Sequence, residues 1–212
     1  MGKDVVITVS RQLGSGGSYL AQRLAKRLNF KYFDREILVH LSYKLGMDID
    51  YMQARDEKIT SVIQNILKSF AMGPPDVSSI PPNVSLLNDD KLFEIQSEII
   101  RKVAEKGNVI FVGRAAFYVL RNVDNVISIF IHANREFRIK RVVEYYKVED
   151  RKEAEKLIDK TDRERKDYIL AHTSRKWLDL TNYSFSFDSS FIGLHTIEHI
   201  ICDFINKYYV NR

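Results

Sequence analysis

Cysteine is almost absent from this chain, and proline is confined to one short segment. The 212 residues include a single cysteine, Cys202, which excludes an internal disulfide framework and is typical of a reducing compartment. We therefore expect a cytoplasmic protein. All four prolines lie in residues 73–85 (GPPDVSSIPPNVS), the best candidate for a flexible connection between helices.

Long hydrophobic runs and a strong excess of one charge are also missing. No segment approaches the roughly 20 apolar residues of a membrane span, so we expect no membrane partner. The net charge is only +5, and basic residues are interleaved with acidic ones, which argues weakly for an anionic ligand. Because the basic residues are scattered and no nucleic-acid-reading motif appears, we expect no nucleic-acid partner.

The chain does contain an alternation of strand-like and helix-like segments. Runs of buried-strand character cover 4–10, 31–33, 108–113, 125–133 and 182–187. Helical spacing of apolar residues covers 17–28, 34–46, 48–71, 88–106, 135–146, 149–170 and 193–209. Strands separated by helices predict an α/β fold with a parallel sheet covered on both faces. Ligands of such sheets bind at the carboxyl ends of the strands.

A glycine-rich loop follows the first predicted strand, in residues 7–24 (ITVSRQLGSGGSYLAQRL). A P-loop reads G-x-x-x-x-G-K-[S/T] between a strand and a helix, and it binds phosphate through backbone amides. On that pattern Gly16 is the second glycine and Ser18 is the hydroxyl that binds Mg²⁺. Arg11 stands in place of the first glycine, and Gly17 in place of the lysine.

The amides expected to bind phosphate belong to five consecutive residues: Gly14, Ser15, Gly16, Gly17 and Ser18. The alternative is a tight turn that only packs the strand against the helix. A dinucleotide fingerprint fits worse, because Tyr19 occupies its third glycine position and only Asp34 could supply its acid.

Five segments in order resemble the cytidylate kinase-like branch of the nucleoside monophosphate kinases. They are ITVSRQLGSGGSYLAQRLAKRL with YFDREIL, FVGRAAFYVL, FRIKRVVEYY, LIDKTDRERKDY and NYSFSFDSS, and they cover nearly the whole chain. The resemblance implies a three-layer P-loop kinase fold in a single kinase-like domain. Its parts would be a core (1–34, 107–146 and 177–212), a helical insertion that binds the nucleoside monophosphate (35–106) and a mobile lid (147–176).

The resemblance also implies an activity, which is transfer of a phosphoryl group from ATP, with Mg²⁺, to a nucleoside monophosphate. CMP, dCMP or a related small acceptor is expected. Phosphoryl transfer needs mainly positioning and charge neutralisation. Arg11 is the nearest replacement for the lysine, unless it only caps a turn at the surface. Arg114 ends a buried strand run and matches the family's Gly-Arg motif, which contacts the acceptor phosphate.

Other residues follow from the same resemblance. Asp34 and Arg35 would bind the acceptor nucleoside and its phosphate, although Asp34 also suits a helix N-cap. Gln96 would lie near the acceptor base, or else on a solvated helix face. Four arginines of the predicted lid and the helix before it would bind phosphates or act as arginine fingers: Arg138, Arg141, Arg163 and Arg165. Arg163 is the strongest candidate of the four, and a solvated face is the alternative for each.

Acidic residues are scarce at the predicted site. Ser10 and Ala115 stand where ordinary cytidylate kinases carry acids, so Ser18, ATP oxygens and water would hold the metal. The missing lysine and acids leave a second hypothesis open, a nucleotide-binding protein with the kinase fold but little turnover. The long helical segments around residues 73–85 could also form a homodimer surface.

Overall fold

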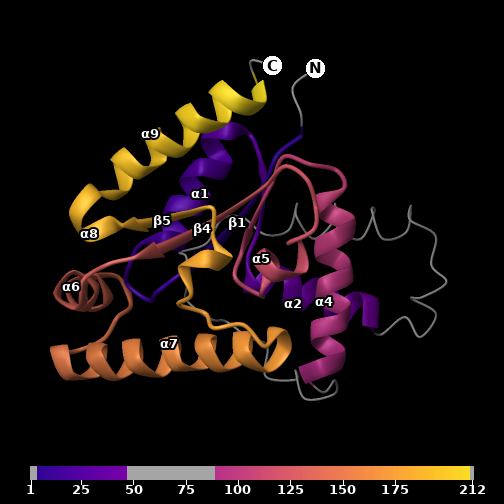
Figure 1. Cartoon of the computed structure of the whole chain (residues 1–212). Helices are drawn as coiled ribbons and strands as arrows, with labels where there is room; N and C mark the ends of the chain where they lie inside the picture. Colours follow the sequence, from indigo (N-terminus) through magenta and orange to yellow (C-terminus); the bar gives the residue numbers. More distant parts are fainter. Residues whose placement is uncertain (1–3, 47–88, 211–212) are drawn as a thin grey trace.

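The computed structural model describes residues 4–46 and 89–210. Its centre is a five-stranded sheet in the order β2-β3-β1-β4-β5, and every neighbouring pair of strands is parallel (Figure 1). The strands are β1 (Val6–Arg11), β2 (Lys31–Phe33), β3 (Val109–Val112), β4 (Val126–His132) and β5 (Phe185–Asp188). The α/β prediction and its parallel sheet are confirmed, with each strand inside or close to its predicted segment.

Helices cover both faces of this sheet and form the outer two of three layers. Figure 1 shows α1 and α9 together on one side and α4 with α5 on the other. The helices are α1 (Gly17–Leu28), α2 (Arg35–Gly46), α4 (Asp89–Ala104), α5 (Ala116–Val119), α6 (Arg135–Tyr145), α7 (Arg151–Thr173), α8 (Ser189–Ile192) and α9 (Leu194–Ile205). A 3₁₀ turn (Leu180–Asn182) and a π-helical end (Asn206–Val210) complete the described chain. The predicted helix 48–71 and the connection 73–85 lie outside the described residues.

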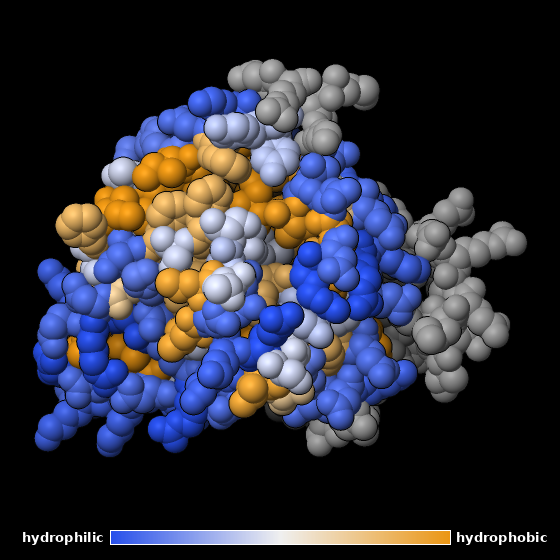
Figure 2. All heavy atoms as spheres, viewed as in Figure 1, coloured by the Kyte–Doolittle hydropathy of each residue, from blue (hydrophilic) through white to orange (hydrophobic). Residues whose placement is uncertain are grey.

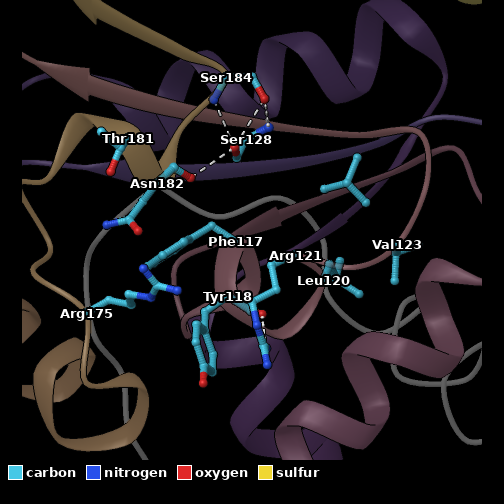
Figure 3. Close-up of a pocket in the computed structure, with 11 residues that line it drawn as sticks. Phe117, Tyr118, Leu120, Arg121, Val123, Ser128, Arg175, Thr181, Asn182 and Ser184 are labelled. Atoms are coloured by element: carbon cyan, nitrogen blue, oxygen red, sulfur yellow. Dashed lines mark hydrogen bonds between the residues drawn. The ribbon is translucent and has the colours of Figure 1, made fainter.

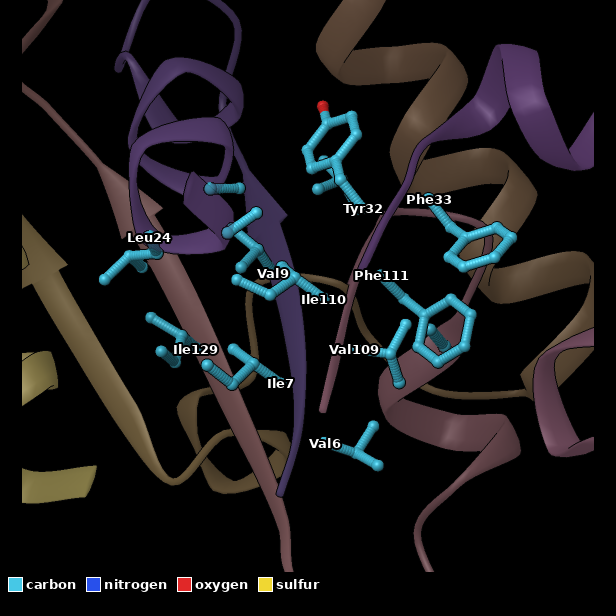
Figure 4. Close-up of a cluster of buried hydrophobic side chains, with 14 of the residues drawn as sticks. Val6, Ile7, Val9, Leu24, Tyr32, Phe33, Val109, Ile110, Phe111 and Ile129 are labelled. Carbon is cyan, nitrogen blue, oxygen red and sulfur yellow. The ribbon is translucent and has the colours of Figure 1, made fainter. Parts of the chain in front are cut away.

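The core explains why the central strands read as continuous apolar runs. Successive side chains of a strand point to opposite faces, and both faces here are covered. Figure 4 shows Ile7 and Ile129 on the α1 side with Leu24, and Phe33 and Phe111 on the opposite side. The rings of Phe33 and Phe111 lie 5.5 Å apart between centroids. Burying each such side chain contributes roughly 1.5–3 kcal/mol, and the sheet is therefore a rigid base for the loops at its carboxyl edge.

Helix α7 lies within the segment predicted as the lid and crosses the carboxyl edge of the sheet. Its first half packs Ala154 and Ile158 against Leu13 and α6, and its second half packs Ile169 near Trp177 and Phe117. Figure 2 shows a mostly hydrophilic surface along α7, whereas hydrophobic residues gather where α8 and α9 meet β5. Within 4–46 and 89–210, none of the helices combines the length and the apolar character needed to cross a membrane.

Candidate active site

The glycine loop connects β1 to α1, and its shape depends on two left-handed residues. Gly14 and Gly16 both have φ of 79°, a conformation that a side chain disfavours. A Cβ at Gly14 would lie 2.6 Å from the backbone oxygen of Arg138, and one at Gly16 would lie 2.6 Å from Leu194 Cδ1. The N–H groups of the first turn of α1 have no acceptor within the helix and open toward this loop. The loop thus has the backbone form of an anion-binding site.

Gly17 is a glycine for a different reason, because the Arg11 side chain passes over it. A Cβ at Gly17 would lie 2.5 Å from Arg11 Cβ. Farther along, Arg11 Nε donates a hydrogen bond of 3.0 Å to Ser18 Oγ, and a Cβ at Gly113 would meet Arg11 NH1 at 2.6 Å. The Arg11 side chain therefore runs from β1 across the start of α1 to the turn after β3. A lysine at position 17 and this path for Arg11 exclude one another.

The turn after β3 is strained and carries the second arginine of the site. Gly113, Arg114 and Ala115 have φ of 78°, 51° and 55° in succession. A left-handed conformation costs a residue with a side chain roughly 1–2 kcal/mol, so other contacts must hold this turn. Arg114 Nε donates to Gln96 Oε1 at 2.9 Å, and the Arg114 guanidinium lies 4.0 Å from the centre of the Tyr168 ring.

The Arg11 guanidinium reaches the turn that carries Arg114, and the positive charge of Arg35 also acts on Arg114. Burial lowers the pKa of Arg114, and the nearby positive charges of Arg35 and Arg11 lower it further. A guanidinium stays protonated in proteins, so the lowered pKa mainly reflects how deeply Arg114 is buried. Tyr168 and Asp89 oppose the shift. Neighbouring arginines of this kind attract a polyanion and are unfavourable without one. Arg11, Arg35 and Arg114 were all predicted site residues.

Two predicted acceptor residues have structural partners. Asp34 Oδ1 accepts a hydrogen bond of 3.1 Å from the Ile37 amide, which satisfies the N-terminus of α2. Gln96 is 0% exposed, which is incompatible with the solvated alternative, and its Nε2 has no hydrogen-bond partner in the described part of the chain. Gln96 thus lies buried beside Arg114 and orients its guanidinium.

Helix α7 is tied to the glycine loop by one carboxylate and two arginines. Asp162 Oδ1 accepts a 2.9 Å hydrogen bond from the Leu13 amide, and Asp162 also forms an ion pair with Arg138. Arg138 Nε in turn donates to the Leu13 carbonyl at 2.7 Å. Arg165 NH1 donates to the Arg11 carbonyl at 2.8 Å. The arrangement fixes the position of the loop relative to α6 and α7.

The structure separates the four arginines of α6 and α7. Arg165 lies at the loop, and Arg141 NH2 would be 3.3 Å from a Cβ at Gly16. Arg138 is buried between Leu13 and Asp162. Arg163 is exposed, because residues two apart on a helix point in different directions. Arg163 and Arg165 were expected to act as a pair, but Arg165 lies at the loop and Arg163 lies in solvent.

An aromatic group beside Arg114 was missed by the sequence reasoning. Phe93 stacks on His172 with centroids 4.5 Å apart, and Tyr168 meets the edge of the same imidazole at 4.6 Å. Burial raises the pKa of Tyr168. Tyr168 follows Arg165 by three residues and so shares its side of α7, and this helical spacing was the signal that could have identified it.

The donor set does not fit a magnesium ion held by the protein. Ser18 is 2% exposed, and its hydroxyl already accepts from the Arg11 guanidinium. Among the residues that the structure describes, no three His, Cys, Asp or Glu side chains come together as a metal site. Mg²⁺ is usually bound by one or two carboxylates together with phosphates and water. Asp162, the carboxylate at the loop, is engaged by Arg138 and the Leu13 amide.

A separate cavity of about 320 Å³ lies beside α5 and β4 (Figure 3). Its lining residues are Phe117, Tyr118, Leu120, Arg121, Val123, Val126, Ser128, Arg175, Thr181, Asn182 and Ser184. The Arg121 guanidinium lies 4.0 Å from the centre of the Tyr118 ring, and Ser128 and Ser184 are hydrogen-bonded to each other. None of the predicted site residues lines this cavity, so it is not the phosphate site.

Solved structures of other proteins resemble this chain over nearly its full length. An uncharacterized protein from Eubacterium ventriosum ATCC 27560 is 25% identical, with 95% of this chain and 98% of that chain covered at a TM-score of 0.68. A shikimate kinase from Bacteroides thetaiotaomicron is 11% identical, with 96% of this chain and 99% of that chain covered at a TM-score of 0.49. A search of curated proteins found no match.

The order of the parallel strands and the glycine loop after β1 are those of a P-loop kinase fold. The model of the cytidylate kinase-like family matches residues 6–191, and the chain belongs to that family.

Proposed function

We propose that this protein transfers the γ-phosphoryl group of ATP to a nucleoside monophosphate in the cytoplasm, with CMP, dCMP or a related small molecule as the acceptor. One observation carries the proposal. The Arg11 side chain leaves the glycine loop and reaches Gly113, next to Arg114. An arginine of the donor loop and the arginine assigned to the acceptor phosphate thereby approach each other, as transfer between two phosphates requires.

The proposed roles divide between two sides of the site. On the donor side, the backbone amides of Gly14 and of residues 16–18 bind the ATP phosphates, while Arg11, Arg141 and Arg165 supply positive charge. The Ser15 amide, also predicted to bind phosphate, donates instead to the Gln12 carbonyl at 3.3 Å. On the acceptor side, Arg114 and Arg35 bind the acceptor phosphate. Asp34 lies at the entrance of α2, where it can accept a hydrogen bond from the nucleoside. Gln96 acts by orienting Arg114, on the strength of their 2.9 Å hydrogen bond.

The decisive experiment is an ATP-consumption assay with a panel of nucleoside monophosphates and small alcohols. Formation of ADP that depends on one nucleoside monophosphate supports the proposal and identifies the acceptor. Arg114→Ala should then lose turnover with that acceptor, whereas Arg151→Ala, which removes an exposed arginine paired with Glu136, should behave as the parent protein. Turnover with an alcohol and with no nucleotide acceptor would contradict the proposal.

The hypothesis of a binding protein with little turnover is supported by the missing lysine, replaced by Gly17, and by the missing acids, replaced by Ser10 and Ala115. This alternative predicts that ATP binds with residues 11–18 around its phosphates while no acceptor in the panel is phosphorylated. Calorimetric titration with ATP, run beside the turnover assay, separates the two functions.

A further inference from the structure

We propose that the glycine loop binds nucleotide phosphates without a divalent cation held by the protein, with the Arg11 guanidinium supplying the positive charge instead. This inference rests on the proposed nucleotide-binding function. It concerns the form of the ligand that the loop prefers, which is the metal-free nucleotide.

Ser18 carries the hydroxyl that the P-loop pattern assigns to a metal. Ser18 is almost completely buried, and its Oγ accepts the 3.0 Å hydrogen bond from Arg11 Nε. A cation bound to this oxygen would share it with a guanidinium and would lie close to a fixed positive charge. Like charges at such a distance repel each other, and partial burial weakens the screening by solvent.

The Arg11 side chain is held in place along its length. Its Cβ and Cγ lie over Gly17, and its NH1 group lies against Gly113. The backbone carbonyl of the same residue accepts a hydrogen bond from Arg165. The guanidinium is thus positioned before any ligand arrives, and a preorganised charge costs little reorganisation on binding.

The charges around the loop also favour a metal-free nucleotide. Arg11 lies against Gly113, next to Arg114, and the charges of Arg35 and Asp89 also act on Arg114. The carboxylate of Asp162 is engaged by Arg138 and by the Leu13 amide. A metal-free nucleotide carries more negative charge than its magnesium complex, and it therefore neutralises the arginines of the site more completely. A planar guanidinium can also bridge two phosphate oxygens, which is the coordination that a metal would otherwise provide.

The test is calorimetric titration of the whole chain with ADP, in excess EDTA and in excess MgCl₂ at matched ionic strength. We expect the affinity in EDTA to be within about threefold of that in MgCl₂, or tighter. A larger loss of affinity in EDTA would show that the loop needs the metal and would overturn the inference.

Two variants sharpen the test. Arg11→Ala should lose at least about tenfold in affinity for metal-free ADP, and MgCl₂ should now improve its binding because the Ser18 hydroxyl is released. Arg151→Ala removes an exposed arginine from α7 and should retain the parent's affinity under both conditions. Metal-free binding by Arg11→Ala at the parent's affinity would overturn the inference.

A failure of the proposed function gives a different result. The folded parent would then bind ADP under neither condition, with its circular-dichroism melting curve intact, and both proposals would fall together. Magnesium-dependent binding would overturn the present inference and leave the proposed function standing.

Discussion

The two central strands β1 and β3 end side by side in turns that reach a left-handed backbone by different means. The loop after β1 uses glycine at both of its left-handed positions, Gly14 and Gly16. The turn after β3 has one glycine, Gly113, and then continues left-handed through Arg114 and Ala115. Each turn places an arginine at the carboxyl edge of the sheet, and the two arginines approach each other at Gly113.

The two turns differ in their use of glycine because they present different groups to a ligand. In the loop after β1, a Cβ at Gly14 would lie 2.6 Å from α6 and one at Gly16 would lie 2.6 Å from α9. Side chains are therefore excluded from these positions, and the loop presents its amides to a ligand. The turn after β3 instead presents the Arg114 side chain, and contacts of Arg114 and Ala115 offset the strain of their left-handed backbone. Ala115 is 1% exposed in an apolar cluster, and Arg114 is held by Gln96 and Tyr168. One turn binds with its backbone and the other with an arginine.

The largest effect should come from removing the side chain that the β3 turn presents. Arg114→Ala should lower kcat/KM for the acceptor by about 10²–10³, because a fixed charge on the phosphate is lost. ATP affinity, measured by calorimetry, should stay close to that of the parent. Arg114→Lys should recover only part of the activity, since an ammonium cannot reproduce a two-pronged contact. Intact kinetics with a lowered melting temperature would assign Arg114 a structural role only.

A second prediction adds a side chain where the β1 loop excludes one. Gly17→Ala places a Cβ 2.5 Å from Arg11 Cβ, so Arg11 must move, and ATP affinity should fall by about tenfold. The free energy of unfolding should also fall by about 1–3 kcal/mol, as in other overpacked sites. Gly193→Ala is the control for ATP affinity, because a Cβ there meets nothing within 4 Å. Its φ of 82° strains an alanine, so Gly193→Ala should lower the free energy of unfolding while ATP affinity survives. Equal ATP affinity in Gly17→Ala and the parent would contradict the proposed path of Arg11.

A third prediction weakens the support of the β3 turn without touching its arginine. Gln96→Leu removes the oxygen that accepts from Arg114, and a hydrogen bond to a charged group contributes about 1.5–3 kcal/mol. We expect kcat/KM for the acceptor to fall by about tenfold, with little change in ATP affinity. Ser97→Ala is the matched control on the same helix, because its buried hydroxyl has no hydrogen-bond partner in the described chain. The same loss in both variants would show a general effect on α4.

The smallest effect should come from Arg163, which is exposed and points away from both turns. Arg165→Ala removes the donor to the Arg11 carbonyl, and it should lower kcat more than Arg163→Ala does. For Arg163→Ala we expect a change of about twofold or less, since exposed surface substitutions usually matter little. Steady-state kinetics of the two variants test this order. The reverse order would mean that α7 turns its other face to the substrates during the reaction.

The elements of the fold could be predicted because they depend on local patterns. Gly17–Leu28 forms the helix that its apolar spacing indicated, and the continuous apolar run 108–113 contains β3. Helix α5 was not predicted, because four residues after a strained turn carry too little periodicity to be identified. The predicted helix 48–71 lies outside the described residues and stays a prediction.

The sequence by itself determined the parallel α/β fold, the glycine loop after β1 and the arginines available to the site, because spacing and residue type encode these features locally. Only the tertiary structure decided which arginines meet. The path of Arg11 depends on space left open by Gly17 and Gly113, which come from two separate elements. Arg163 and Arg165 differ by two positions on one helix, and the packing of α7 directs one to solvent and the other to the loop. Contacts between distant segments set these directions, and no local pattern contains them.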